Sequence, residues 1–134
     1  MTRSKIKLNN PTFSGIIRQS MTTKSDLEKI LAKFGITDCK ISWLSDYDPT
    51  YRGPQIINMG NRSIGGTHWI AAYDGKYFDS FGMPAPPSLT HLEWTPLQIQ
   101  KIDEGRCGQW CALWIYYTKK GELDEFYSMF NIVS

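Results

Sequence analysis

The chain has 134 residues, of which 41% are apolar, 13% aromatic and 21% charged. This is the size and composition of one folded domain, and it excludes a disordered or low-complexity chain. No segment approaches the roughly 18 consecutive apolar residues of a membrane span, and the first twenty residues hold no apolar run of the kind found in signal peptides. We therefore expect a single soluble domain over 1–134, a monomer with no membrane partner.

The net charge is +2, but it is unevenly distributed, because residues 1–25 carry five basic and no acidic side chains. We expect residues 1–24 to form a basic, partly mobile arm; a solvated tail and an arm that contacts nucleic acid or an acidic protein surface both fit this pattern. The three cysteines, Cys39, Cys107 and Cys111, are odd in number and too few for a disulfide scaffold, which favours a reducing compartment.

The first predicted element is an amphipathic helix. Ser25 and Glu28 have the spacing of a capping box, in which each side chain bonds the other residue's backbone amide. Gly35 supplies a helix stop. Between them the apolar side chains recur at helical spacing, at Leu27, Ile30, Leu31 and Phe34. After a short segment at 41–44, the turn-rich stretch 45–54 predicts a loop and 55–59 a strand.

The strongest local signal is a β-hairpin. Two β-prone runs, 69–73 and 76–81, flank Asp74 and Gly75, the preferred pair for a two-residue turn. This register places His68 across from Phe81. It also makes His68 and Asp79 diagonal neighbours on one face, close enough for their side chains to meet.

The second half of the chain predicts two helices. Residues 107–117 are apolar on nearly every side, which favours a buried helix closed by Lys119, Lys120 and Gly121. Residues 123–130 suggest a last, amphipathic helix. Residues 89–99 between the hairpin and these helices fit either a short helix or a short strand.

Cys107 and His68 are the candidate reactive groups. Cys107 begins the buried helix directly after Arg106, and both the helix dipole and the guanidinium favour a thiolate. Its base would be His68, oriented by Asp79, because His91 has no carboxylate in view. A core histidine and a buried filler cysteine are the structural alternative, and Cys111 is better read as core packing. The cysteine spacing matches no common zinc motif.

With these residues in place, the chain resembles the adenovirus endopeptidase (adenain) group of viral cysteine proteases and, more broadly, the clan it shares with ubiquitin-like-protein proteases. The resemblance runs from about Ser25 to Tyr117, and its motifs occur in the clan's order: Gly66 to Trp69, Tyr77 to Gly82, Gln100, and Arg106 to Gly108. It implies an α+β, adenain-like fold whose central helix carries the nucleophile at its N-terminus and packs on a mixed β-sheet.

The resemblance also implies the site. Cys107 would be the nucleophile, His68 the base and Asp79 its orienting acid, while the Gln100 side chain would complete the oxyanion hole with the Cys107 amide. Trp69 would lie over small substrate residues, although a core aromatic is an equal alternative. Aspartate at the acid position is the ubiquitin-like-protein protease pattern.

The implied function is an endopeptidase that cleaves viral capsid or core precursors at glycine-containing sites, in the virion and the infected host cell of a small DNA virus, a virophage or a virus-like transposon. No cofactor is needed for the chemistry, and activation by DNA or a peptide stays open. Two alternatives are a protease that removes ubiquitin-like modifiers from host proteins and a virion binding module without activity.

Overall fold

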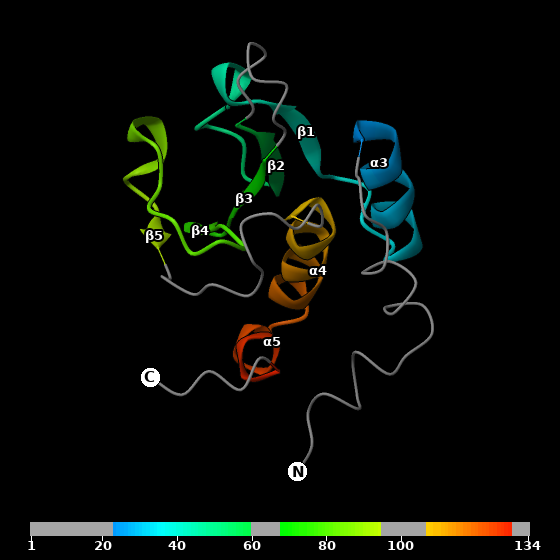
Figure 1. The fold of residues 1–134 in the computed structure, drawn as a ribbon. Helices are drawn as coiled ribbons and strands as arrows, with labels where there is room; N and C mark the ends of the chain where they lie inside the picture. Colours follow the sequence, from blue (N-terminus) through cyan, green and yellow to red (C-terminus); the bar gives the residue numbers. More distant parts are fainter. Residues whose placement is uncertain (1–22, 60–67, 95–106, 130–134) are drawn as a thin grey trace.

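The computed structural model describes residues 23–59, 68–94 and 107–129 (Figure 1). Residues 1–22 of the predicted basic arm (1–24) and the predicted connection at 60–66 lie outside these residues, whereas Thr23 and Lys24 begin the first helix. In chain order the elements are α3 (Lys24–Lys33), β1 (Lys40–Trp43), the 3-10 turn η1 (Leu44–Asp46), β2 (Gln55–Asn58), β3 (Trp69–Tyr73), β4 (Lys76–Phe78), η3 (Pro87–Leu89), β5 (Glu93–Trp94), α4 (Cys107–Lys119) and α5 (Leu123–Ser128).

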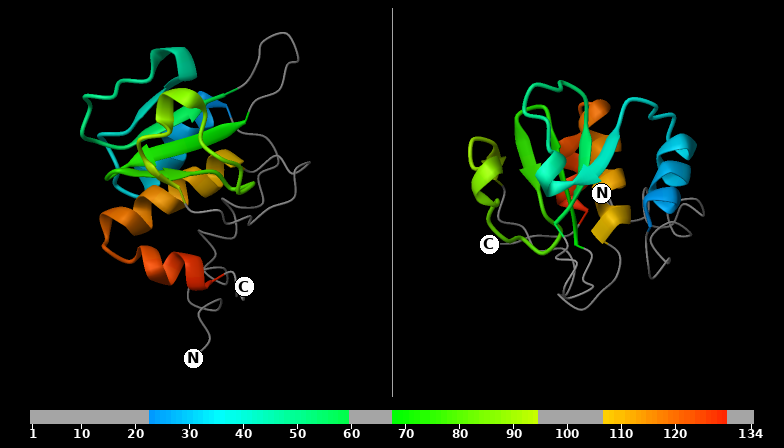
Figure 2. Two further views of the ribbon diagram at one scale, coloured as in Figure 1. Left: turned by 90° about the vertical axis from the view of Figure 1, so that its left-hand side faces the viewer. Right: turned by 90° about the horizontal axis from the view of Figure 1, so that it is seen from above.

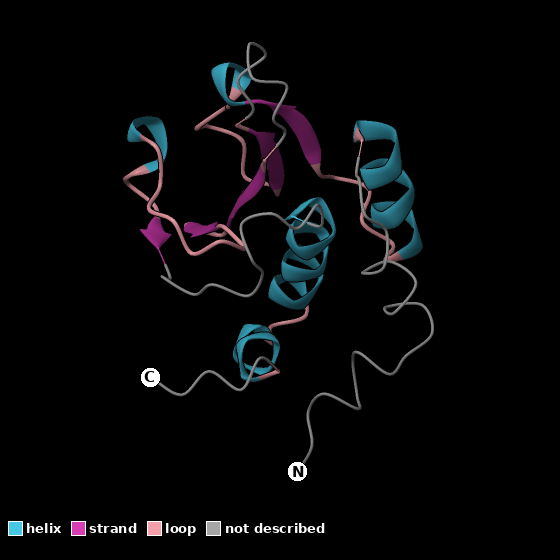
Figure 3. Ribbon diagram, in the orientation of Figure 1, coloured by secondary structure: helices cyan, strands magenta, loops and turns pink. Residues whose placement is uncertain are grey.

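The described strands form one mixed sheet in the order β1-β2-β3-β4-β5 (Figure 3). The pairs β1–β2 and β4–β5 are parallel, whereas β2–β3 and β3–β4 are antiparallel. Helices α3, α4 and α5 lie on one side of this sheet and η3 lies on the other (Figure 2). The expected α+β class with a mixed sheet is confirmed.

Side-chain alternation along β3 divides the core in two. Trp69 and Ala71 face α4 and join the larger cluster around that helix. Ile70 and Ala72 point the opposite way, into a smaller cluster with the fully buried Tyr77. The sheet is therefore covered on both faces, and α4 contacts β3, α3 and α5 at the centre of the larger cluster (Figure 2).

Helix α4 confirms the predicted buried helix and extends it to Lys119. Its side chains are buried on nearly every side of the helix, and Cys111, Leu113 and Trp114 are fully inaccessible to solvent. Gly121 follows with φ of +70°, a left-handed conformation that suits glycine. In the described parts of the chain, no helix combines the length and apolarity that crossing a bilayer requires.

The start of α3 corrects the sequence prediction. The N-cap is Thr23, whose hydroxyl accepts from the Asp26 amide at 3.1 Å while the Asp26 carboxylate accepts from the Thr23 amide at 3.0 Å. The expected box of Ser25 and Glu28 is wrong, since both residues already lie inside the helix. The Thr23 box starts the helix earlier than a Ser25 cap would, which adds helical hydrogen bonds and leaves the buried apolar stripe unchanged.

The predicted hairpin is confirmed, register included. Asp74 and Gly75 form its turn with φ values of 55° and 74°, as a type I′ turn requires. Tyr73 pairs with Lys76 and Ala71 with Phe78. The strand β4 ends at Phe78, so Asp79 leaves the sheet directly after it.

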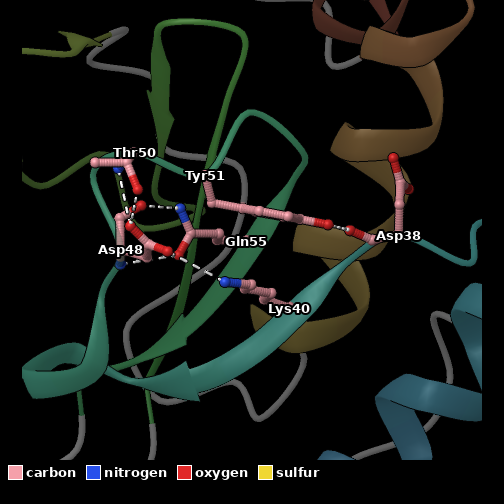
Figure 4. A network of polar contacts seen from close by, with 6 residues as sticks. All are labelled: Asp38, Lys40, Asp48, Thr50, Tyr51 and Gln55. Atoms are coloured by element: carbon pink, nitrogen blue, oxygen red, sulfur yellow. Dashed lines mark hydrogen bonds and ion pairs between the residues drawn. The ribbon is translucent and has the colours of Figure 1, made fainter.

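A polar network braces the loop between β1 and β2 (Figure 4). The Asp48 carboxylate accepts from the Thr50 amide at 2.9 Å and from Lys40 Nζ at 3.2 Å, and the buried Gln55 carboxamide bonds the Asp48 backbone in both directions. Tyr51 donates its hydroxyl hydrogen to the Asp38 carbonyl. The predicted loop at 45–54 is thus an ordered crossover that returns the chain to run parallel to β1.

The remaining predictions differ only in length. The last helix is α5, which ends at Ser128 rather than at Phe130. The ambiguous region 89–99 holds the end of η3 and the two-residue strand β5, which extends the sheet, and its residues from 95 onward lie outside the described structure.

Candidate active site

Three separate elements meet at one end of the sheet. His68 directly precedes β3, Asp79 directly follows β4, and Cys107 is the first residue of α4. The hairpin register brings the first two together, and the packing of α4 on β3 adds the third. The Trp69 backbone N–H donates to Cys107 Sγ at 3.2 Å, which ties the helix start to the strand start.

His68 and Asp79 make the direct contact predicted for them. The distance from His68 Nε2 to Asp79 Oδ1 is 2.7 Å, and the Asp79 side chain is only 2% exposed. The same oxygen accepts from the Phe81 N–H at 2.8 Å, and the Gly82 N–H donates to the Asp79 carbonyl at 2.8 Å. A tight turn therefore fixes the carboxylate against the imidazole, so that Nε2 carries a hydrogen in the site.

The Cys107 thiol lies close to the same imidazole. Its sulfur is near enough to interact with the His68 ring, whereas His68 Nδ1 is buried and makes no hydrogen bond within the described residues. The pKa of His68 is raised from 6.5 to about 9. Burial alone lowers it, and the hydrogen bond to Asp79, the interaction with Cys107 and the charges of both groups more than offset that effect. The imidazole is thus poised to hold the proton that the thiol gives up.

The other two cysteines have different surroundings. Cys111 is fully buried one turn further along α4, and burial raises its pKa well above the ordinary value. Burial, followed by the charge of Asp38, raises the pKa of Cys39 to about 12. Both thiols are held in the neutral, unreactive form. The interpretation of Cys111 as core packing is confirmed.

Two other predicted groups lie in the described structure. The Trp69 side chain is 5% exposed and packs in the cluster between the sheet and α4. This is the core position weighed as the alternative, and contact with substrate stays a prediction. His91 lies elsewhere, with its Nε2 3.4 Å from the Tyr47 hydroxyl. Gln100 and Arg106 fall outside the described residues.

Sequence reasoning assigned no role to Phe81. The hairpin register already placed it across from His68, and the structure stacks its ring on the imidazole, with centroids 4.3 Å apart and planes 1° apart. The sequence did contain a signal for this contact: Phe81 is an aromatic residue two positions after Asp79, and the predicted register places it opposite His68.

The arrangement suits nucleophilic chemistry. The Cys107 backbone N–H lies in the first turn of α4, where amides have no partner within the helix and the helix dipole is positive. If the sulfur attacked a carbonyl group, the oxyanion formed on the carbonyl oxygen would be stabilised there. Within the ranges that the structure describes, no three His, Cys, Asp or Glu side chains are grouped to hold a metal ion.

Comparison with protein-family models, with curated proteins and with solved structures finds no match to this chain.

Proposed function

We propose that the protein is a cysteine endopeptidase with Cys107 as nucleophile, His68 as base and Asp79 as the group that orients the base. The observation that carries the proposal is the 2.7 Å contact between His68 and a buried Asp79 beside a cysteine at the head of α4. A histidine that only filled the core would need neither a buried carboxylate on Nε2 nor a neighbouring thiol.

The proposed reaction has two halves. His68 accepts the Cys107 proton, and the thiolate attacks the carbonyl carbon of the scissile peptide bond, so that the oxygen becomes an oxyanion at the Cys107 amide. The imidazolium then protonates the leaving amine as the C–N bond breaks, which leaves a thioester. His68 next removes a proton from water, whose oxygen attacks the thioester, and the acid product departs as the Cys107 thiol is regenerated.

The substrate class rests on the resemblance alone. It favours viral capsid or core precursors cleaved at glycine-containing sites, with Gln100 as the second oxyanion donor and Trp69 near the substrate, in the virion and infected cell. One observation favours the removal of ubiquitin-like modifiers as a second candidate: the acid is the aspartate Asp79, as in the ubiquitin-like-protein proteases.

The nucleophile is tested by thiol labelling. We expect iodoacetamide at neutral pH to modify Cys107 first, because His68 lies beside it to take its proton, whereas the pKa of both other thiols, Cys39 and Cys111, is raised. Peptide mapping after partial labelling measures the order. The matched control is His68→Gln, which keeps Cys107 and should slow its labelling toward that of the other two thiols. Equal labelling of all three cysteines in the wild-type protein would contradict an activated thiol.

The reaction is tested with two sets of substrates. Virion precursor proteins and modifier-linked proteins are each incubated with the wild-type chain and with Cys107→Ser, with and without DNA. Serine retains an acceptor for the Trp69 amide, so this variant should fold normally and cleave nothing. Cleavage of one set by the wild type alone decides between the two substrate classes. If neither set is cut under any condition, the virion binding module becomes the better account.

A further inference from the structure

The aromatic ring stacked on the proposed base is held by its own backbone. Phe81 donates its N–H to the Asp79 oxygen that also contacts His68, at 2.8 Å. The turn that contains it is closed by Gly82, whose φ of +74° is open to glycine at little cost. The same turn that sets the carboxylate therefore places the Phe81 backbone beside it.

The Phe81 ring packs on one face of the imidazole. Planes 1° apart with centroids 4.3 Å apart describe two parallel rings in van der Waals contact, slightly offset. The His68 side chain nevertheless remains 24% exposed, so the stack leaves part of it accessible. Phe81 thus supports the base without blocking it.

Parallel stacking restricts one motion in particular. If His68 turned about its Cβ–Cγ bond, the ring would pass through an orientation perpendicular to Phe81, and its edge would enter the space that the phenyl ring occupies. A half turn would place a ring carbon where Nε2 meets Asp79. The imidazole would then lose its hydrogen bond to the carboxylate.

We propose that Phe81 is a positioning residue for the reaction proposed above: its ring blocks rotation of the His68 imidazole and so keeps Nε2 on Asp79 and the imidazole beside Cys107. It acts through His68 and touches no reacting atom itself. The inference rests on the proposed function for its catalytic consequence, but the orientation of the ring can be measured without any substrate.

The test compares three variants. Phe81→Leu keeps an apolar side chain but lacks a flat face, Phe81→Tyr keeps the face, and Phe81→Ala removes both. The first readout is the ring ¹⁵N NMR signals of His68 in histidine-labelled protein, which has only one other histidine, His91. We expect one set of signals with hydrogen on Nε2 in the wild type and in Phe81→Tyr, and averaged or doubled His68 signals in the leucine and alanine variants.

The second readout is peptide cleavage. We expect Phe81→Leu to lower kcat about tenfold, the upper end for one aromatic pair, with KM unchanged, and Phe81→Tyr to restore it. Unchanged His68 signals in Phe81→Leu would overturn the proposal at any level of activity, and so would altered signals with an unchanged kcat. A wild-type chain that cuts nothing would instead refute the proposed function, and the NMR comparison would still decide whether Phe81 fixes the ring.

Discussion

Replacement of Asp79 by asparagine tests the electrostatics of the site. Asparagine has nearly the same volume, and its oxygen can still accept from His68 and from the Phe81 amide, but the charge is gone. Because the carboxylate is 2% exposed and lies 2.7 Å from His68 Nε2, water does little to screen it. Loss of such a charge lowers the pKa of a partner by about one to three pH units. We therefore expect the pKa of His68 to fall from about 9 toward or below its ordinary value of 6.5.

Each pH unit corresponds to about 1.4 kcal/mol of preference for the protonated imidazole. The assay is an NMR titration of the two histidines between about pH 5 and about pH 10, with His91 as the internal reference. Asp74→Asn is the matched control, since this carboxylate lies on the same hairpin but is 68% exposed and pairs with Lys76. A pKa near 9 for His68 in Asp79→Asn would refute the reasoning.

Three further predictions concern stability. The pKa of His68 is about 9 in the folded chain, higher than the 6.5 of a free imidazole, so its contribution to stability is fully present below about pH 6.5 and is lost as the pH rises through about 9. We expect the free energy of unfolding in urea to fall by about 3 kcal/mol across this window. The same loss in His68→Gln would contradict this prediction. Thr23→Ala should destabilise the fold by about 0.5 to 2 kcal/mol in thermal or urea unfolding, whereas Ser25→Ala should change little, and equal effects would argue against the Thr23 cap. Gly75→Ala should cost about 1 to 2 kcal/mol, because alanine resists a φ of 74°, and Gly75→Asn should cost less; an alanine variant as stable as the wild type would exclude the type I′ turn.

The hairpin and the central helix could be predicted because their signals are local. Asp74 and Gly75 determine the turn, the turn determines the register, and the register places Asp79 beside His68 by counting alone. Residues 107–117 are too long and too uniformly apolar for a strand. A thiol at the head of that helix followed directly from where the apolar run begins.

Other features depended on competition or on distant contacts. Thr23 with Asp26 and Ser25 with Glu28 are both sound capping boxes, and spacing alone does not rank them. The parallel pairing of β5 with β4 joins strands separated by η3, and no periodicity encodes it. The stacking of Phe81 on His68 depends on side-chain torsions, which the register restricts but does not determine.

The sequence separation within the candidate site has a consequence for how that site forms during folding. His68 and Asp79 belong to one hairpin, a unit whose contacts are local, whereas Cys107 comes from a helix that must dock on β3 across a distance of 38 residues. A chain with a formed hairpin and an undocked α4 has His68 beside Asp79 but not yet Cys107. Under the proposed function, cleavage therefore depends on this long-range docking as well as on the local hairpin.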